Sequence, residues 1–268
     1  MTLSLRGKIL FTAVVVLIYA FLLAPILIVV VAAFNSGAYL RFPPEGFSTK
    51  WFVSFAHNRS FVDSLFFSLR LAAFVTVLST VIGTAAAFYV ARGPRRFRDA
   101  VRILMIAPLP VPAILTGLAL LIFFYGIGIG TRGMIGLIIG HTLICLPFVF
   151  LVVATVLVGV DPSLEEASRN LGAGPLTTFW RVTLPIIKGG IISGAIFAFI
   201  TSYDQFPISL LLGGVGNTPL PVQLFDYLRF SFDPTAAVAG TISILMATIV
   251  VLVTERMVGL ESLYWGSG

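Results

Sequence analysis

The amino-acid sequence predicts an all-α protein that crosses a membrane several times, and three observations support this fold class. The 268 residues are 58% hydrophobic and only 10% charged, with a mean hydropathy of +1.06, whereas soluble domains carry about 25% charged residues. Several apolar runs reach the roughly 20 residues that a membrane-spanning helix needs. These runs do not alternate polar and apolar residues as barrel strands do. The composition therefore excludes an ordinary soluble enzyme, a disulfide-rich secreted domain and a disordered protein.

The apolar stretches predict six transmembrane helices in a single transmembrane domain over residues 1–268. The predicted spans lie near residues 9–34, 65–91, 103–125, 134–160, 189–212 and 235–253. The first run is longer than the apolar region of a signal peptide, so we expect a retained helix. Pro108, Pro110 and Pro112 interrupt the third run. We expect a kinked helix there, since membrane helices tolerate proline where neighbours satisfy the freed carbonyls; a chain break is the alternative.

The distribution of lysine and arginine predicts the orientation. Six spans place both termini on one side, and that side also holds a short basic segment with Arg92, Arg95, Arg96, Arg98 and Arg102. Because cytoplasmic loops carry an excess of Lys and Arg, we expect both termini and the segments 92–102 and 161–188 to be cytoplasmic. Five spans would leave the C-terminus outside, which is the alternative.

The sequence holds no motif for nucleotide or metal chemistry. Neither a Walker A loop, a Rossmann fingerprint nor an H-E-x-x-H pair occurs. His57 and His141 are far apart, and Cys145 lies inside an apolar run, so we predict no catalytic residue, no metal site and no disulfide. The chain is not expected to be an enzyme. The net charge of +6 is explained by topology, and no nucleic-acid partner is predicted. If the chain drives transport, the energy would come from an ion gradient or from a partner.

One ionisable residue is predicted to lie deep in a span. Asp204 falls in the outer part of the fifth span, beside Ser202, Tyr203 and Gln205. A carboxylate there is costly unless it faces a cavity or a partner, so these four residues are candidates for the pathway of a cationic or polar solute. Pro207 should loosen the helix. The alternative is that Asp204 pairs with Arg70 or with a cation of a partner subunit.

The segment 161–188 is long and charged compared with the other loops. Ser163 and Glu166 form a capping box that predicts a short helix starting near Leu164, with Gly172 at its end. Pro175 predicts a second helix, which Pro185 should end before the membrane. The second helix carries an apolar stripe of Leu176, Phe179 and Val182. This pair of short helices within residues 161–188, called the knob below, would fit a groove on another protein. A plain surface hairpin is the alternative.

Two further patterns concern packing and an outer loop. Gly136-x-x-x-Gly140 and Gly190-x-x-x-Gly194 predict close helix contacts. The outer loop Gly213–Pro234 is too long for a turn, and it is expected either to contain a re-entrant helix or to be a surface loop.

The knob also resembles a known family signature. Glu166-Ala167-Ser168, Gly172 and Val182-Thr183-Leu184-Pro185 are similar to the EAA signature of ABC importer permeases, and every gap matches. Ser168 and Val182 depart from the signature by small changes. Further stretches, Phe42 to Ser48 and Ser202 to Phe206, resemble the second permease of spermidine/putrescine-type importers.

The resemblance implies a type I ABC importer permease that forms half of a pathway for a small cationic organic solute, polyamine-like in class. It implies a bacterial inner-membrane location and, as partners, membrane lipid, a second permease, a periplasmic solute-binding protein and two ATPase subunits that bind ATP and Mg²⁺. The alternative is an ion-coupled secondary transporter or a channel subunit. The implied ATPase-coupling residues are Glu165, Glu166, Ala167, Gly172, Leu184 and Pro185.

Overall fold

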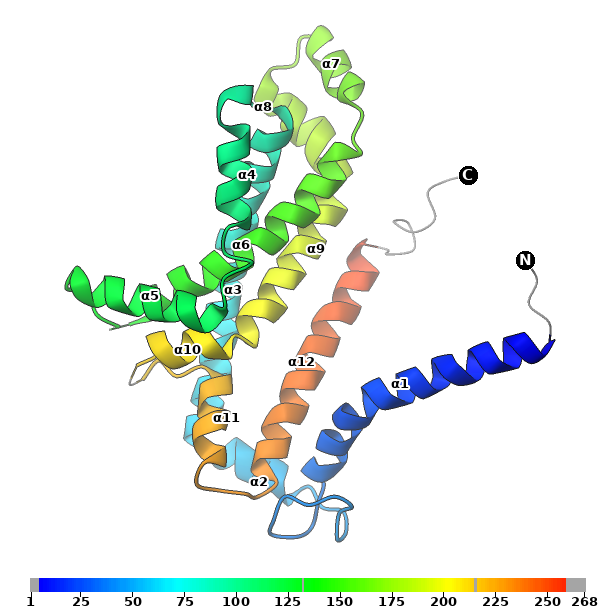
Figure 1. The fold of residues 1–268 in the computed structure, drawn as a ribbon, viewed down its shortest axis with the longest axis vertical. Helices are drawn as coiled ribbons and strands as arrows, with labels where there is room; N and C mark the ends of the chain where they lie inside the picture. The colour runs from blue at the N-terminus through cyan, green and yellow to red at the C-terminus, as the bar shows by residue number, and fades with distance from the viewer. Residues whose placement is uncertain (1–4, 132, 215, 259–268) are drawn as a thin grey trace. The chain divides into compact units, whose positions relative to one another are not determined.

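The computed structural model describes residues 5–131, 133–214 and 216–258, and this part of the chain is helical without a sheet (Figure 1). The helices are α1 Leu5–Ala33, α2 Lys50–His57, α3 Arg59–Arg92, η1 Arg95–Phe97, α4 Arg98–Ile106, α5 Ala113–Gly126, α6 Met134–Val158, α7 Pro162–Asn170, α8 Pro175–Thr178, η2 Phe179–Thr183, α9 Leu184–Tyr203, α10 Phe206–Leu212, α11 Leu220–Leu228 and α12 Thr235–Val258. Among the described residues, five helices are long and apolar enough to cross a membrane, and the apolar helix Ala113–Gly126 is shorter. The all-α membrane fold is therefore confirmed.

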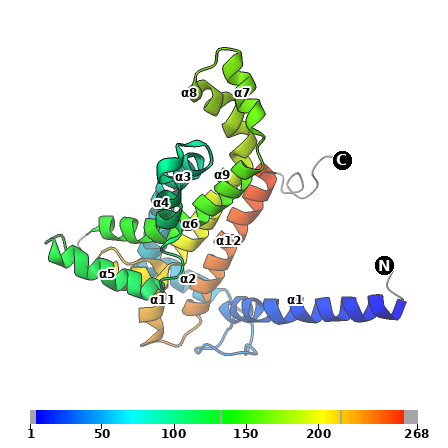
Figure 2. The same cartoon turned by 45° about the horizontal axis from the view of Figure 1, so that its top comes forward.

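The described chain divides into two compact units, residues 5–62 with 224–248 and residues 63–223 with 249–258. In the larger unit, α6 and α9 run side by side in both views (Figures 1 and 2). A Cβ added at Gly190 would lie 2.7 Å from Val156 Cγ2, and one at Gly194 would lie 3.2 Å from Val149 Cα. Glycine at these positions lets the two backbones approach, which confirms the predicted close packing.

Close packing also gives this unit its core. Apolar side chains of α3, α6, α9 and α10 form one buried cluster, and many of them are fully excluded from solvent: Val75, Leu137, Val149, Val153, Leu157, Ile187, Ala198, Ile208 and Leu212. A Cβ at Gly140 would lie 2.7 Å from Ile208 Cγ2, so α10 also sits directly on α6. This core holds the helices that carry the candidate site.

The predicted third span is not a kinked helix. Helix α4 ends at Ile106, turns follow, and α5 starts at Ala113 after Pro112. Three prolines at every second position remove successive backbone donors, and each disfavours helical backbone in the residue before it. A single kink cannot accommodate the loss of several hydrogen bonds, and the helix is interrupted between Ile106 and Ala113.

The predicted fifth span differs at both ends. The second helix of the 161–188 segment does not stop at Pro185; helical structure runs from Pro175 to Tyr203, with a π-helical stretch at Phe179–Thr183. The wide π turn accommodates the proline, because local π geometry re-satisfies backbone groups that a proline frees. At the other end, the helix stops at Tyr203 and α10 starts at Phe206.

The smaller unit contains the loop between α1 and α2. Asn35 is fully buried and organises it: its side-chain oxygen accepts from the backbone N–H groups of Gly37 and Glu45, each at 3.0 Å, and its amide donates to the Tyr39 carbonyl at 2.9 Å. The loop 213–234 contains a helix, α11, which begins at Leu220 and ends at Leu228 and whose residues are divided between the two units.

Candidate functional site

The segment 161–188 contains both predicted helix starts, but the second helix continues past Pro185 and the first cap differs from the prediction. The N-cap is Asp161, whose side chain accepts from the Ser163 N–H at 2.9 Å, and Pro162 occupies the first turn. Proline is pre-organised for that position, and an aspartate before it is a strong cap. The bonds from Ser163 hold the pKa of the Asp161 carboxyl below its ordinary value.

Gly172 ends α7 as predicted. Its φ is +88°, its N–H donates to the Arg169 carbonyl, and the Ala173 N–H donates to the Ser168 carbonyl. These two bonds around a left-handed residue form a Schellman motif. The chain reverses there into α8, which starts at Pro175.

Glu165 is the buried member of the candidate coupling residues. It is 4% exposed, and Arg92 Nε donates to both of its carboxylate oxygens at 3.2 Å. Arg92 Nη2 donates to the Val160 carbonyl at 3.0 Å, and Thr183 Oγ1 donates to Glu165 Oε1 at 3.0 Å. The carboxylate thus joins α7 to the end of α3 and to η2.

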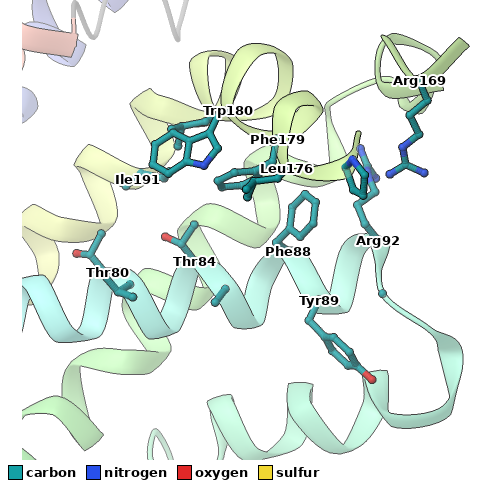
Figure 3. Close-up of a pocket in the computed structure, with 15 residues that line it drawn as sticks. Thr80, Thr84, Phe88, Tyr89, Arg92, Arg169, Leu176, Phe179, Trp180 and Ile191 are labelled. Carbon is teal, nitrogen blue, oxygen red and sulfur yellow. The ribbon is translucent and has the colours of Figure 1, made fainter. Parts of the chain in front are cut away.

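An aromatic contact lies one helical turn before this ion pair. Phe88 of α3 meets Phe179 edge to face, with ring centroids 5.2 Å apart, and the two side chains point toward one another in Figure 3. They line an apolar groove of about 940 Å³ between α3 and the α8–α9 helix, with Arg92 and Arg169 near its α7 end. Aromatic pairs of this geometry contribute stability beyond that gained by burying their apolar surface.

The other coupling candidates lie toward the surface. Glu166, Ala167, Gly172 and Pro185 are exposed, and Leu184 is half-buried at the edge of the groove. Two apolar neighbours are exposed beside them: Leu171 is 89% and Leu176 is 71% accessible. The knob therefore offers apolar and acidic groups outward while Glu165 points inward.

The substrate-pathway candidates gather at the break between α9 and α10. Asp204 lies at the C-cap of α9, not inside a helix, and it is exposed on the surface of the single chain. Gln205 is the N-cap residue of α10 and is half-buried. Ser202 and Tyr203 are buried, and Tyr203 stacks on Phe199 with ring centroids 6.2 Å apart. No ion pair between Asp204 and Arg70 occurs among the described residues.

His141 of α6 links the two sides of this break. It is 1% exposed, with Nδ1 3.0 Å from Ser202 Oγ and Nε2 3.0 Å from Ser209 Oγ. The Ser209 hydroxyl donates to the Gln205 carbonyl, so its oxygen is free only to accept from the ring. A neutral His141 therefore carries its proton on Nε2 and accepts from Ser202 at Nδ1.

Sequence reasoning did not find Arg92, Thr183, His141 or Ser209 as members of these networks. The sequence alone places Arg92 in a basic segment, and its partner is 73 positions away. The detectable signals were an arginine at the very end of a span and a histidine within an apolar run, since such groups need a partner when buried.

Comparison with a protein-family model identifies residues 79–259 as a binding-protein-dependent transport system inner membrane component. The putrescine transport system permease protein PotI of Escherichia coli (strain K12) is 34% identical over 230 residues, covering 84% of this chain and 82% of PotI. The spermidine/putrescine transport system permease protein PotC of the same strain is 28% identical over 249 residues, covering 93% of this chain and 94% of PotC.

A solved structure shares the fold. A bacterial alginate ABC transporter, in complex with an alginate pentasaccharide-bound periplasmic protein, contains a chain that matches with a TM-score of 0.72 at 18% identity. The match covers 94% of each chain.

Proposed function

Because the chain belongs to the family of binding-protein-dependent transport system inner membrane components, we propose that it works with a second permease, two ATP-binding cassette subunits and a periplasmic solute-binding protein. It is a permease subunit of an ABC importer. ATP and Mg²⁺ would bind to the ATPase partners, and this chain would contribute no catalytic residue. The alginate transporter with its periplasmic protein supports a delivery partner of this kind.

The observation that carries the proposal is the exposed knob of α7, α8 and η2. Glu166, Ala167 and Gly172 lie outward on it, beside the exposed Leu171 and Leu176. An amphipathic element with apolar anchors fits a groove on a partner. Because α8 continues into α9 without a stop, movement of the knob would be passed directly to a membrane-spanning helix. Leu184 and Pro185 lie at this join.

The solute we propose is a polyamine or a related small organic cation. Two relatives that cover most of the chain carry putrescine or spermidine/putrescine in their names. The exposed Asp204 carboxylate at a helix break suits an ammonium group, because an intramembrane carboxylate needs a cationic partner or water. Gln205 and Tyr203 would flank the solute, and Ser202 would act from the adjoining turn.

We further propose that the whole chain, residues 1–268, forms one transmembrane domain in a bacterial inner membrane with both termini cytoplasmic. The cluster from Arg92 to Arg102 supports this orientation by the positive-inside rule. ATP binding in the partners would move the knob and switch the pathway between its two sides.

The test is uptake of labelled putrescine and spermidine by the purified complex in proteoliposomes with ATP on the knob side. We expect Asp204→Asn to reduce uptake by about tenfold or more, since one ion pair to a desolvated cation is lost. The matched control Asp99→Asn, at an exposed carboxylate of α4, should leave uptake unchanged. Transport by the chain alone without ATP would contradict the proposal and favour a secondary transporter or channel.

A further inference from the structure

We propose that Arg92 and Glu165 are positioning residues whose ion pair makes α3, α7 and η2 a single rigid body. The proposal rests on the proposed function for its consequence, because a rigid body at this place would carry movement of the knob into α3 as well as α9.

The first support is the number of segments that meet at one carboxylate. Glu165 receives Arg92 from α3 and Thr183 from η2, while Arg92 also binds the Val160 carbonyl just before α7. Arg92 and Glu165 side chains are 18% and 5% exposed. Four stretches of chain are therefore joined by three side chains with little access to water.

The second support is the energetic cost of separating a buried ion pair. A buried ion pair adds little net stability over well-packed apolar groups, but removing one partner leaves an uncompensated charge. Sliding α7 past α3 would separate the charges without water to replace the bonds. The pair therefore permits one relative position of the two helices and opposes the neighbouring ones.

The third support is a second contact that prevents rotation about the first. Phe88 lies four residues before Arg92 on α3, and Phe179 lies four residues before Thr183 in η2. The Phe88–Phe179 rings meet at 5.2 Å, and the view in Figure 3 shows Phe88, Phe179 and Arg92 along the same side of α3. Two contacts one helical turn apart define an orientation as well as a distance.

The adjacent glutamates thereby have separate tasks. Glu165 is buried against α3, whereas Glu166 is exposed, because consecutive residues on a helix point about 100° apart. Glu166 would remain available to a partner while Glu165 holds the segment from within.

The test measures whether α3 and α7 keep their distance. Spin labels are attached at Ile82→Cys on α3 and Asn170→Cys on α7, both exposed positions. The native Cys145 is buried, and buried thiols resist labelling. In the full chain in lipid nanodiscs, we expect one narrow distance distribution. In the assembled transporter, that distance should be the same without nucleotide and with ATP trapped.

Glu165→Gln should broaden the distribution and lower solute uptake per ATP hydrolysed by about tenfold. Arg92→Gln should do the same, and the double variant should be no broader than either single variant. Glu166→Gln is the matched control and should keep the distribution narrow. If Glu165→Gln does not insert into the membrane, Thr183→Val removes one hydrogen bond while keeping both charges, and it should give a smaller broadening.

A narrow distribution in Glu165→Gln, or in Thr183→Val where that variant is used, would overturn the inference. So would a wild-type distance that changes between the nucleotide states. If no ATPase partner co-purifies, the proposed function fails; the nanodisc measurement on the chain alone still decides whether the ion pair fixes α3 to α7.

Discussion

Two buried polar networks in the unit of residues 63–223 each bond a neighbouring helix to an irregular part of the fifth span, and they do so with different side chains. The network at the knob uses a charged pair, Arg92 and Glu165, with Thr183. The network at the α9–α10 break uses His141 with Ser202 and Ser209. Each ties a neighbouring helix to a place where the fifth span is irregular, the π stretch in one case and the break in the other.

The difference follows from the surroundings of each network. The charged pair lies at the end of a predicted span, where Arg92 keeps 18% of its side chain exposed. His141 is 1% exposed within α6, and an unpaired charge in such a place is very costly. The charged pair therefore lies at the end of a span, where only Arg92 is partly exposed, whereas the neutral hydrogen bonds lie around a fully buried residue of α6.

The largest effect is expected from Glu165→Leu, because it leaves the Arg92 guanidinium without its counter-charge. We expect the free energy of unfolding in detergent micelles to fall by about 3–5 kcal/mol. The control is Glu45→Gln, which removes an exposed pair with Arg41 at 3.4 Å and should change stability by less than about 1 kcal/mol. Equal effects of the two variants would contradict the distinction between buried and exposed pairs.

A smaller effect is expected from His141→Leu. The change removes two neutral hydrogen bonds and leaves Ser202 without its acceptor, so the loss should be about 1–3 kcal/mol by the same unfolding measurement. His141→Gln keeps a donor and an acceptor and should lose less. A loss for His141→Leu above that for Glu165→Leu would reverse the order of the two networks.

Gly172→Ala tests the knob without touching either network. A Cβ at this position meets no atom within 4 Å, so the cost comes only from the left-handed backbone and should be about 1–2 kcal/mol. Thermal unfolding of the reconstituted chain measures it. An unchanged midpoint would mean that the turn after α7 adopts another conformation.

The smallest effect is expected at Asp161. Its carboxyl has a lowered pKa in the folded chain because it accepts from Ser163, so its stabilising contribution is present above the unfolded pKa and lost as pH falls through the folded pKa. Thermal midpoints of Asp161→Ala and the parent chain should therefore converge in acid. Asp161→Asn, which caps without a charge, should show no such pH dependence.

The sequence predicted the elements that depend on local pattern. The long apolar runs, the helix end at Gly172 and the start at Pro175 are present where expected, since capping and proline chemistry act over a few residues. The capping-box pattern predicts Ser163 as the first cap, two residues after the actual cap Asp161, because both residues are good capping residues.

The parts that could not be predicted depend on distant partners. Whether Pro185 ends a helix is decided by the π turn before it. The break after Tyr203 agrees with the expected effect of Pro207, which lies in the first turn of α10. The bonds from His141 of α6 to Ser202 and Ser209 on the two sides of that break could not be predicted. The burial of Glu165 requires Arg92 at the end of another span. No local pattern distinguishes Glu165 from the exposed Glu166.

Site-directed cross-linking in the assembled complex tests most directly whether the knob contacts an ATPase subunit on the cytoplasmic side. With Cys145 buried, a cysteine at Glu166→Cys should form a cross-link to a co-purified ATPase subunit and should react with a membrane-impermeant reagent added to inverted vesicles. Labelling from the outside of intact spheroplasts, or the absence of any cross-linked partner, would contradict the proposed contact between the knob and a cytoplasmic ATPase.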